Sequence, residues 1–213
     1  TMNFYVLKYF NNINSFKKTN IYTIAAPFEG TKMASPKFVY NILSQMEDSG
    51  TSAEENYAIL KTQGAPSIAT LPYDEKHLSW SADEKIWREA LNCRLKDFKN
   101  LEYIGRDDRE ITSATDPDLD EIKSALNNGQ MVTFSSYIYC WVFDTLKTHP
   151  DAPENSKYAG EKIVKYLDGT NGSHRMVIVG YNDEIWFDQN SNNKVDEGGK
   201  GAFKIANLWV ISG

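Results

Sequence analysis

The spacing and type of the apolar residues change after Gly129, and this change constrains the fold more than any other feature of the sequence. Before Gly129 the apolar residues recur at helical spacing between turns. After it, the segments "QMVTFSSYIYCWVF", "RMVIVGYNDEIWF" and "GAFKIANLWVI" are rich in β-branched and aromatic residues at strand length. Helices that precede the strands, instead of alternating with them, predict an α+β fold with two segregated lobes.

Each predicted helix is marked by start or stop signals. We expect helices over residues 35–48, 52–64, 81–98 and 117–129. The first opens with Ser-Pro, an N-cap followed by an N1 proline. The second and third open with a Ser-x-x-Glu capping box, and the fourth opens with a proline and early acids. Gly64 and Gly129 are the expected stops of the second and fourth helices.

Composition excludes several classes of function. The 213 residues carry a net charge of -6, and the 23 basic residues form no run among 29 acidic ones. We therefore do not expect the chain to bind nucleic acid or an anionic membrane surface. No run approaches 18 apolar residues, which predicts no membrane insertion, and the start "TMNFYVLKYF" lacks the pattern of a signal peptide. Two cysteines, Cys93 and Cys140, allow one bridge or two free thiols.

Three landmarks follow one another along the chain. They are "SPKFVYN" with "LKTQGAPSIATLPYDE" behind it, then "GSHRMVIVGYND", and finally "GAFKIANLW". Together they resemble the papain-like (C1) cysteine peptidases, particularly the bacterial branch in which an acidic, Asn-rich insert precedes the last landmark. The resemblance extends over residues 19–209, which is nearly the whole chain.

The resemblance implies a papain-like two-lobe fold and assigns roles to single residues. A helical first lobe would take in residues 12–110, a β-rich second lobe would take in residues 111–213, and a peptide or protein ligand would lie in the groove between them. In the family, the residue matching His174 is the catalytic base and the residue matching Asn207 orients it. Trp209 matches a tryptophan that shields this pair from water, and Tyr73 matches a residue near the groove. The chain stops at Gly213, before the strands that complete the second lobe in the family.

The family's nucleophile has no cysteine counterpart at its expected position. Aligning the Cys-Trp-Ala-Phe…Glu-Gly helix with "TNIYTIAAPFEG", residues 19–30, places Thr19 at the nucleophile. Thr19 lies 155 residues before His174, close to the family's separation of about 130–150. Cys140, in "YCWVF", has the right neighbours but lies only 34 residues before His174 and after the "LPYD" landmark. We expect Cys140 to lie in a core strand.

The oxyanion position is also altered. The glutamine that donates to the oxyanion falls at Ile13, and Asn12 or Asn14 could replace it after a one-residue shift. Loss of one such donor costs roughly 3–4 kcal/mol of transition-state stabilisation. A threonine hydroxyl is also far less acidic than a thiol at a helix N-terminus.

These departures favour a catalytically inactive papain-like homologue that binds a peptide or protein. The alternative is an active C1-type cysteine peptidase whose nucleophile is Cys93, Cys140 or a residue on a preceding piece of chain. By resemblance, we expect a secreted or cell-surface location.

The insert "DQNSNNKVDEG", residues 188–198, alternates oxygen-bearing positions as an EF-hand loop does. The candidate calcium ligands are Asp188, Asn190, Asn192, the Lys194 carbonyl and Asp196. Asn193 stands where an EF-hand has glycine, and Gly199 stands where it has a bidentate glutamate, although Asp183 or Glu197 could supply that ligand. The sequence leaves open a weak Ca²⁺ site or a solvated polar hairpin. A third functional alternative follows, a calcium-stiffened surface or adhesion module of a larger extracellular protein.

Overall fold

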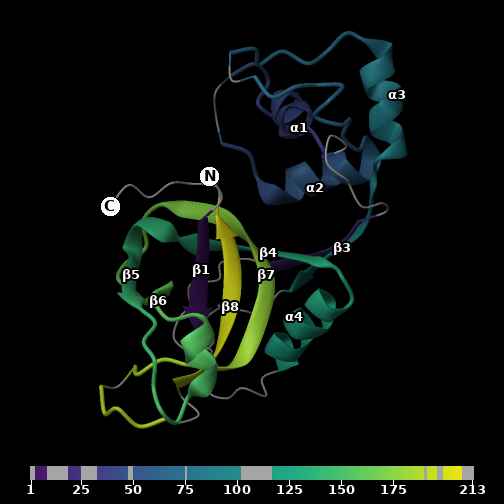
Figure 1. The fold of residues 1–213 in the computed structure, drawn as a ribbon. Coiled ribbons are helices and arrows are strands. Elements are labelled where there is room, and N and C mark those ends of the chain that lie inside the picture. Colours follow the sequence, from purple (N-terminus) through teal and green to yellow (C-terminus); the bar gives the residue numbers. More distant parts are fainter. Residues whose placement is uncertain are drawn as a thin grey trace. The chain divides into compact units, whose positions relative to one another are not determined.

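The computed structural model describes residues 3–8, 19–24, 33–47, 50–74, 76–101, 117–189, 191–195 and 199–207 (Figure 1). It contains both helices and a largely antiparallel sheet, which confirms the predicted α+β class. The chain divides into two compact units. A helical unit spans Tyr22–Phe98, and a sheet unit combines Thr1–Ile21 with Lys99–Gly213.

In the described part of the helical unit, three helices begin near the predicted caps. They are α1 (Pro36–Leu43), α2 (Ala53–Thr62) and α3 (Glu84–Asn92). The capping box of α2 is confirmed, because the Glu55 N–H donates to Ser52 Oγ and the Ser52 N–H donates back to Glu55. The box predicted at Ser81 is wrong. Asp83 caps α3 instead, with its carboxylate accepting from the Lys85 N–H at 2.9 Å.

The backbone at Gly64, which follows α2, comes close to the last turn of α3. Gly64 has a φ of 75°, and a Cβ there would lie 2.0 Å from the carbonyl oxygen of Ala90. The chain can therefore pass this close to Ala90 only with glycine at this position. The helical unit has its own hydrophobic core, whose buried apolar residues are Phe38, Val39, Ala65, Ile86 and Ala90.

Two predicted helical stretches are strands in the structure. The helix expected to run to residue 98 ends at Asn92, and β3 (Leu95–Leu101) follows. The segment aligned with the nucleophile helix forms β2 (Thr19–Ile24) over its first part. The sequence "TNIYTI" is dense in β-branched side chains, which lose rotamer freedom in a helix and fit a pleated sheet. For these residues the helix expectation is wrong.

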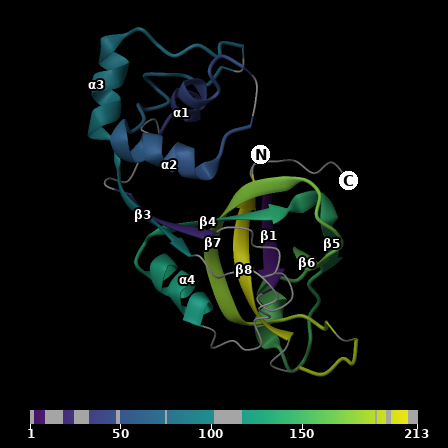
Figure 2. The ribbon, with the colours of Figure 1, turned by 180° about the vertical axis from the view of Figure 1, so that it is seen from behind.

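The described strands of the chain form one eight-stranded sheet with the order β3-β2-β4-β7-β8-β1-β6-β5 (Figures 1 and 2), in which β2 and β3 each run across a boundary of the sheet unit. The remaining strands are β1 (Asn3–Lys8), β4 (Met131–Tyr137), β5 (Trp141–Thr145), β6 (Lys162–Leu167), β7 (Ser173–Trp186) and β8 (Lys200–Asn207). The long strand β7 pairs antiparallel with β4 on one side and with β8 on the other. Strand β1 pairs antiparallel with β8 and parallel with β6.

Helix α4 (Pro117–Asn127) supplies part of the main core of this unit, and Gly129 follows it with the left-handed φ of 71° that a helix stop uses. Alternate side chains of β4 and β7, including Phe134, Met176 and Ile178, share this core with Ile122 of α4. A second core contains Leu146, Ile163, Ile185, Phe187 and Ala202. Within the described ranges, no helix is long and apolar enough to cross a membrane.

Candidate functional site

His174 lies at the beginning of β7, on the face of the sheet that carries the main core. Side chains alternate along a strand, so His174 shares a face with the buried Met176 and Ile178. The β7–β8 register pairs Val177 with Ala206, which places the Asn207 backbone one step further on, opposite Met176. The backbone position of Asn207 is thus a diagonal neighbour of His174 across two adjacent strands, a separation over which cross-strand pairs can interact.

One residue beside His174 was not predicted from the sequence. Ser136 of β4 pairs directly with His174, and its side chain is fully buried. Its Oγ accepts a 2.8 Å hydrogen bond from the indole N–H of Trp141, which begins β5. The buried Ser136 hydroxyl therefore holds the Trp141 indole in place. Strand alternation places Ser136 on the same face as the buried Val132 and Phe134.

Cys140 does not lie in a strand, so that expectation is wrong. It ends a short 3-10 helix, Ile138–Cys140, which links β4 to β5. The Asn171 N–H donates to its Sγ at 3.1 Å, and its thiol lies 3.6 Å from the Asn171 carbonyl oxygen. The thiol therefore engages the backbone before β7, and its hydrogen bonds are not to the His174 ring. Cys93 caps α3, and both cysteines are free.

The other residues carried over from the resemblance are only partly placed. Thr19 is the first residue of β2, so no helix begins there. Ile13 and Trp209 lie outside the described residues. Tyr73 is 58% exposed in the helical unit.

The first part of the insert folds around the carboxylate of Asp188. Its two oxygens accept the backbone N–H groups of Asn192 and Asn193 at 3.1 and 3.0 Å, and Asn192 accepts from the Lys194 N–H at 2.8 Å. Asn193 adopts a φ of 55°, the left-handed conformation that an EF-hand gives to glycine. Asn190 and Asp196 lie outside the described residues. Within the described part of the chain, no three His, Cys, Asp or Glu side chains group as metal ligands.

The base of the insert is fixed by one buried asparagine. Asn155 is 1% exposed, and its amide donates to the Lys147 and Trp186 carbonyls at 2.9 and 2.7 Å. Its carbonyl accepts from the Trp186 N–H at 2.9 Å. Asn155 therefore ties the end of β7 to the segment that follows β5.

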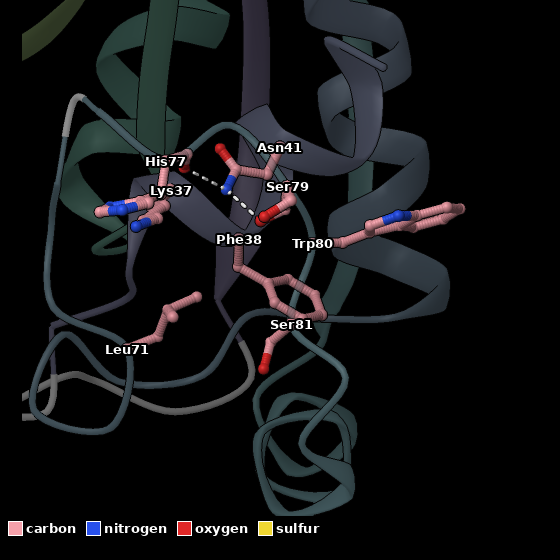
Figure 3. Close-up of a pocket in the computed structure, with 8 residues that line it drawn as sticks. All are labelled: Lys37, Phe38, Asn41, Leu71, His77, Ser79, Trp80 and Ser81. Atoms are coloured by element: carbon pink, nitrogen blue, oxygen red, sulfur yellow. Dashed lines mark hydrogen bonds between the residues drawn. The ribbon is translucent and has the colours of Figure 1, made fainter. Parts of the chain in front are cut away.

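The helical unit contains a pocket of about 260 Å³. It is lined by Lys37, Phe38, Asn41, Leu71, His77, Ser79, Trp80 and Ser81 (Figure 3). The buried Asn41 donates to the carbonyls of His77 and Ser79 at 3.0 and 2.8 Å, which fixes the loop that forms one wall. No sequence landmark pointed to this pocket, because its lining comes from one helix and a long irregular loop.

An ion cluster borders the pocket. One carboxylate oxygen of Asp74 contacts Nδ1 of the His77 ring and lies 3.5 Å from the Lys37 ammonium. Its other oxygen accepts the Lys76 N–H at 2.8 Å. The hydrogen bond from His77, followed by that from the Lys76 backbone, lowers the pKa of Asp74 to about 2. Asp74 is therefore an anion at any physiological pH.

Comparisons with protein-family models, with curated proteins and with solved structures found no match for the chain.

Proposed function

We propose that the chain is a papain-like cysteine peptidase homologue that has lost its nucleophile and binds peptides without cleaving them. The observation that carries this proposal is the register of β7 and β8, which makes His174 and Asn207 diagonal neighbours on adjacent strands. A base and the amide that orients it need this proximity, and the order of the landmarks along the chain agrees with the same assignment. In this proposal the two units correspond to the lobes of the papain-like fold.

The loss of catalysis follows from the chemistry of the residue at the nucleophile position. Cysteine peptidases need a thiolate, which forms when a helix N-terminus and an imidazolium lower the pKa of the thiol. Thr19 offers a hydroxyl, and it begins a strand instead of a helix. The pair at His174 would then contribute polar contacts to a bound peptide and no proton transfer.

The second candidate is an active peptidase that uses Cys140. One observation favours Cys140 over Cys93 as the nucleophile. The Cys140 thiol accepts a hydrogen bond from the backbone of Asn171, three residues before His174 on the chain. A shift of that loop on substrate binding would be needed to bring the thiol to the ring, because a nucleophile must come within hydrogen-bond reach of its base.

Reporter hydrolysis and thiol labelling separate the two candidates. For the inactive homologue, we expect no hydrolysis of fluorogenic peptide substrates and no labelling by an epoxide warhead directed at active-site thiols. The matched variants are Cys140→Ser, Cys93→Ser and His174→Ala. Turnover that disappears in Cys140→Ser and His174→Ala but persists in Cys93→Ser would establish the active enzyme and refute the inactive one.

A further inference from the structure

The Lys37 side chain lies at the edge of the pocket in the helical unit. Its side chain is 10% exposed, and Asp74 at 3.5 Å is its one polar contact among the residues that the structure describes. An ammonium has three N–H donors, so this single contact leaves Lys37 able to donate to a further acceptor. Asp74 is itself shared, since it also bonds His77 and the Lys76 backbone. The site can therefore accommodate another anionic acceptor.

The rest of the pocket offers apolar and aromatic surface. Phe38 is 3% exposed and lies at the centre of the lining, whereas Trp80 keeps 59% of its surface exposed. Lys37 and His77 lie on one side of the pocket in Figure 3, and Trp80 lies on the other. An aromatic ring placed between Lys37 and Trp80 would bury its own apolar surface in the pocket and could stack on the exposed Trp80 side chain.

The wall that carries Trp80 is held in place before any ligand arrives. Asn41 fixes the carbonyls of His77 and Ser79, and the Trp87 indole N–H donates to the Ser81 carbonyl at 2.7 Å. The Trp87 ring in turn packs edge-on against Phe38, with ring centroids 4.9 Å apart. A preformed wall reduces the ordering cost of binding.

From these contacts we infer that the pocket binds an aromatic group joined to a carboxylate, with the carboxylate on Lys37 and the ring against Trp80. A C-terminal aromatic residue of a peptide and a free aromatic acid share this chemistry. The volume of about 260 Å³ suits one residue, not a long segment. The site uses neither His174 nor Asn207, so this inference goes beyond the proposed function and can fail independently of it.

Ligand pairs on the wild-type protein provide the first test. N-acetyl-L-phenylalanine should bind at least about tenfold tighter than its primary amide, because the amide lacks the charge that the ammonium needs. It should also bind tighter than N-acetylglycine, which keeps the carboxylate and lacks the ring. Calorimetry measures all three dissociation constants. Equal affinity for the acid and the amide, or no saturable binding of the acid, would overturn the inference.

Variants provide the second test. Lys37→Met keeps the aliphatic stem and should abolish the preference for acid over amide, and Trp80→Ala should abolish the preference for the ring. The matched control is Lys61→Met, which removes an exposed ammonium paired with Asp97 at 2.7 Å and should leave all affinities unchanged. A full acid preference in folded Lys37→Met would contradict the assignment. If Lys37→Met does not fold, the wild-type ligand pairs decide the question.

Two tripeptides distinguish the sources of the ligand. Ala-Ala-Phe carries the ring next to its C-terminal carboxylate, whereas Phe-Ala-Ala separates the two groups. Stronger binding of Ala-Ala-Phe than of N-acetyl-L-phenylalanine would assign a peptide C-terminus, and weaker binding would assign a free aromatic acid. Equal binding of the two tripeptides would refute the requirement that ring and carboxylate be adjacent.

Discussion

Replacing Asn155 with alanine should destabilise the sheet unit strongly, because one side chain satisfies three backbone groups there. The bonds to the Lys147 carbonyl, the Trp186 carbonyl and the Trp186 N–H measure 2.9, 2.7 and 2.9 Å. Each bond contributes about 1 kcal/mol, and a buried group left without a partner costs about 1–3 kcal/mol. Water entering the space can satisfy some of these groups, so we expect a loss of about 2–4 kcal/mol.

Chemical denaturation measures this loss as a change in midpoint at constant slope. The expected loss corresponds to a fall of roughly 5–15 °C in melting temperature for a chain of this size. The matched control is Asn128→Ala, which removes an exposed amide that makes no side-chain hydrogen bond to the described residues and should change stability by less than about 0.5 kcal/mol. A loss below about 1 kcal/mol in Asn155→Ala would refute the assignment of Asn155 as a structural tie.

Three further predictions concern the helical unit and the insert. Gly64→Ala should lower the free energy of unfolding in urea more than Gly129→Ala. Both glycines have positive φ, but only at Gly64 would an added Cβ lie 2.0 Å from a backbone oxygen, so equal losses would contradict the close approach of Gly64 to Ala90. Asp74 has a folded pKa of about 2, below its unfolded value, so it contributes stability above about pH 4 that is lost as the pH falls through 2. Asp74→Asn should therefore flatten that part of the pH–stability curve, and an unchanged curve would count against the Asp74–His77 contact. If the insert binds calcium, millimolar Ca²⁺ should raise the melting temperature of the wild type and not of Asp188→Ala, whereas a shift of the same size in both would exclude Asp188 as a ligand.

The sequence predicted those parts of the fold that depend on local signals. The capping box at Ser52, the proline that starts α1 and the stop at Gly129 all act over a few residues, and the structure confirms them. Strands β4, β7 and β8 were predicted because their β-branched and aromatic runs need no long-range information. Strand β1 was missed, since its position between β8 and β6 depends on partners more than 150 residues away.

The errors have physical causes as well. The segment at Thr19 was predicted as a helix because it was aligned with a family helix, although its own β-branched residues favour the strand that the structure has. Cys140 was expected in a strand because "YIYCWVF" is rich in β-branched and aromatic residues at strand length, yet a 3-10 turn interrupts the run. The pocket at Lys37 and Trp80 could not be predicted, since its shape depends on the path of an irregular loop held by Asn41.

The central proposal, a chain that binds peptides and does not cleave them, is tested most directly by incubating the protein with a defined mixture of peptides. The peptides that remain bound after washing are then released and weighed by mass spectrometry, with His174→Ala as the comparison. The account predicts retained peptides of unchanged mass in the wild type and weaker retention in His174→Ala. Shortened peptides that form with the wild type and are absent with His174→Ala would contradict it.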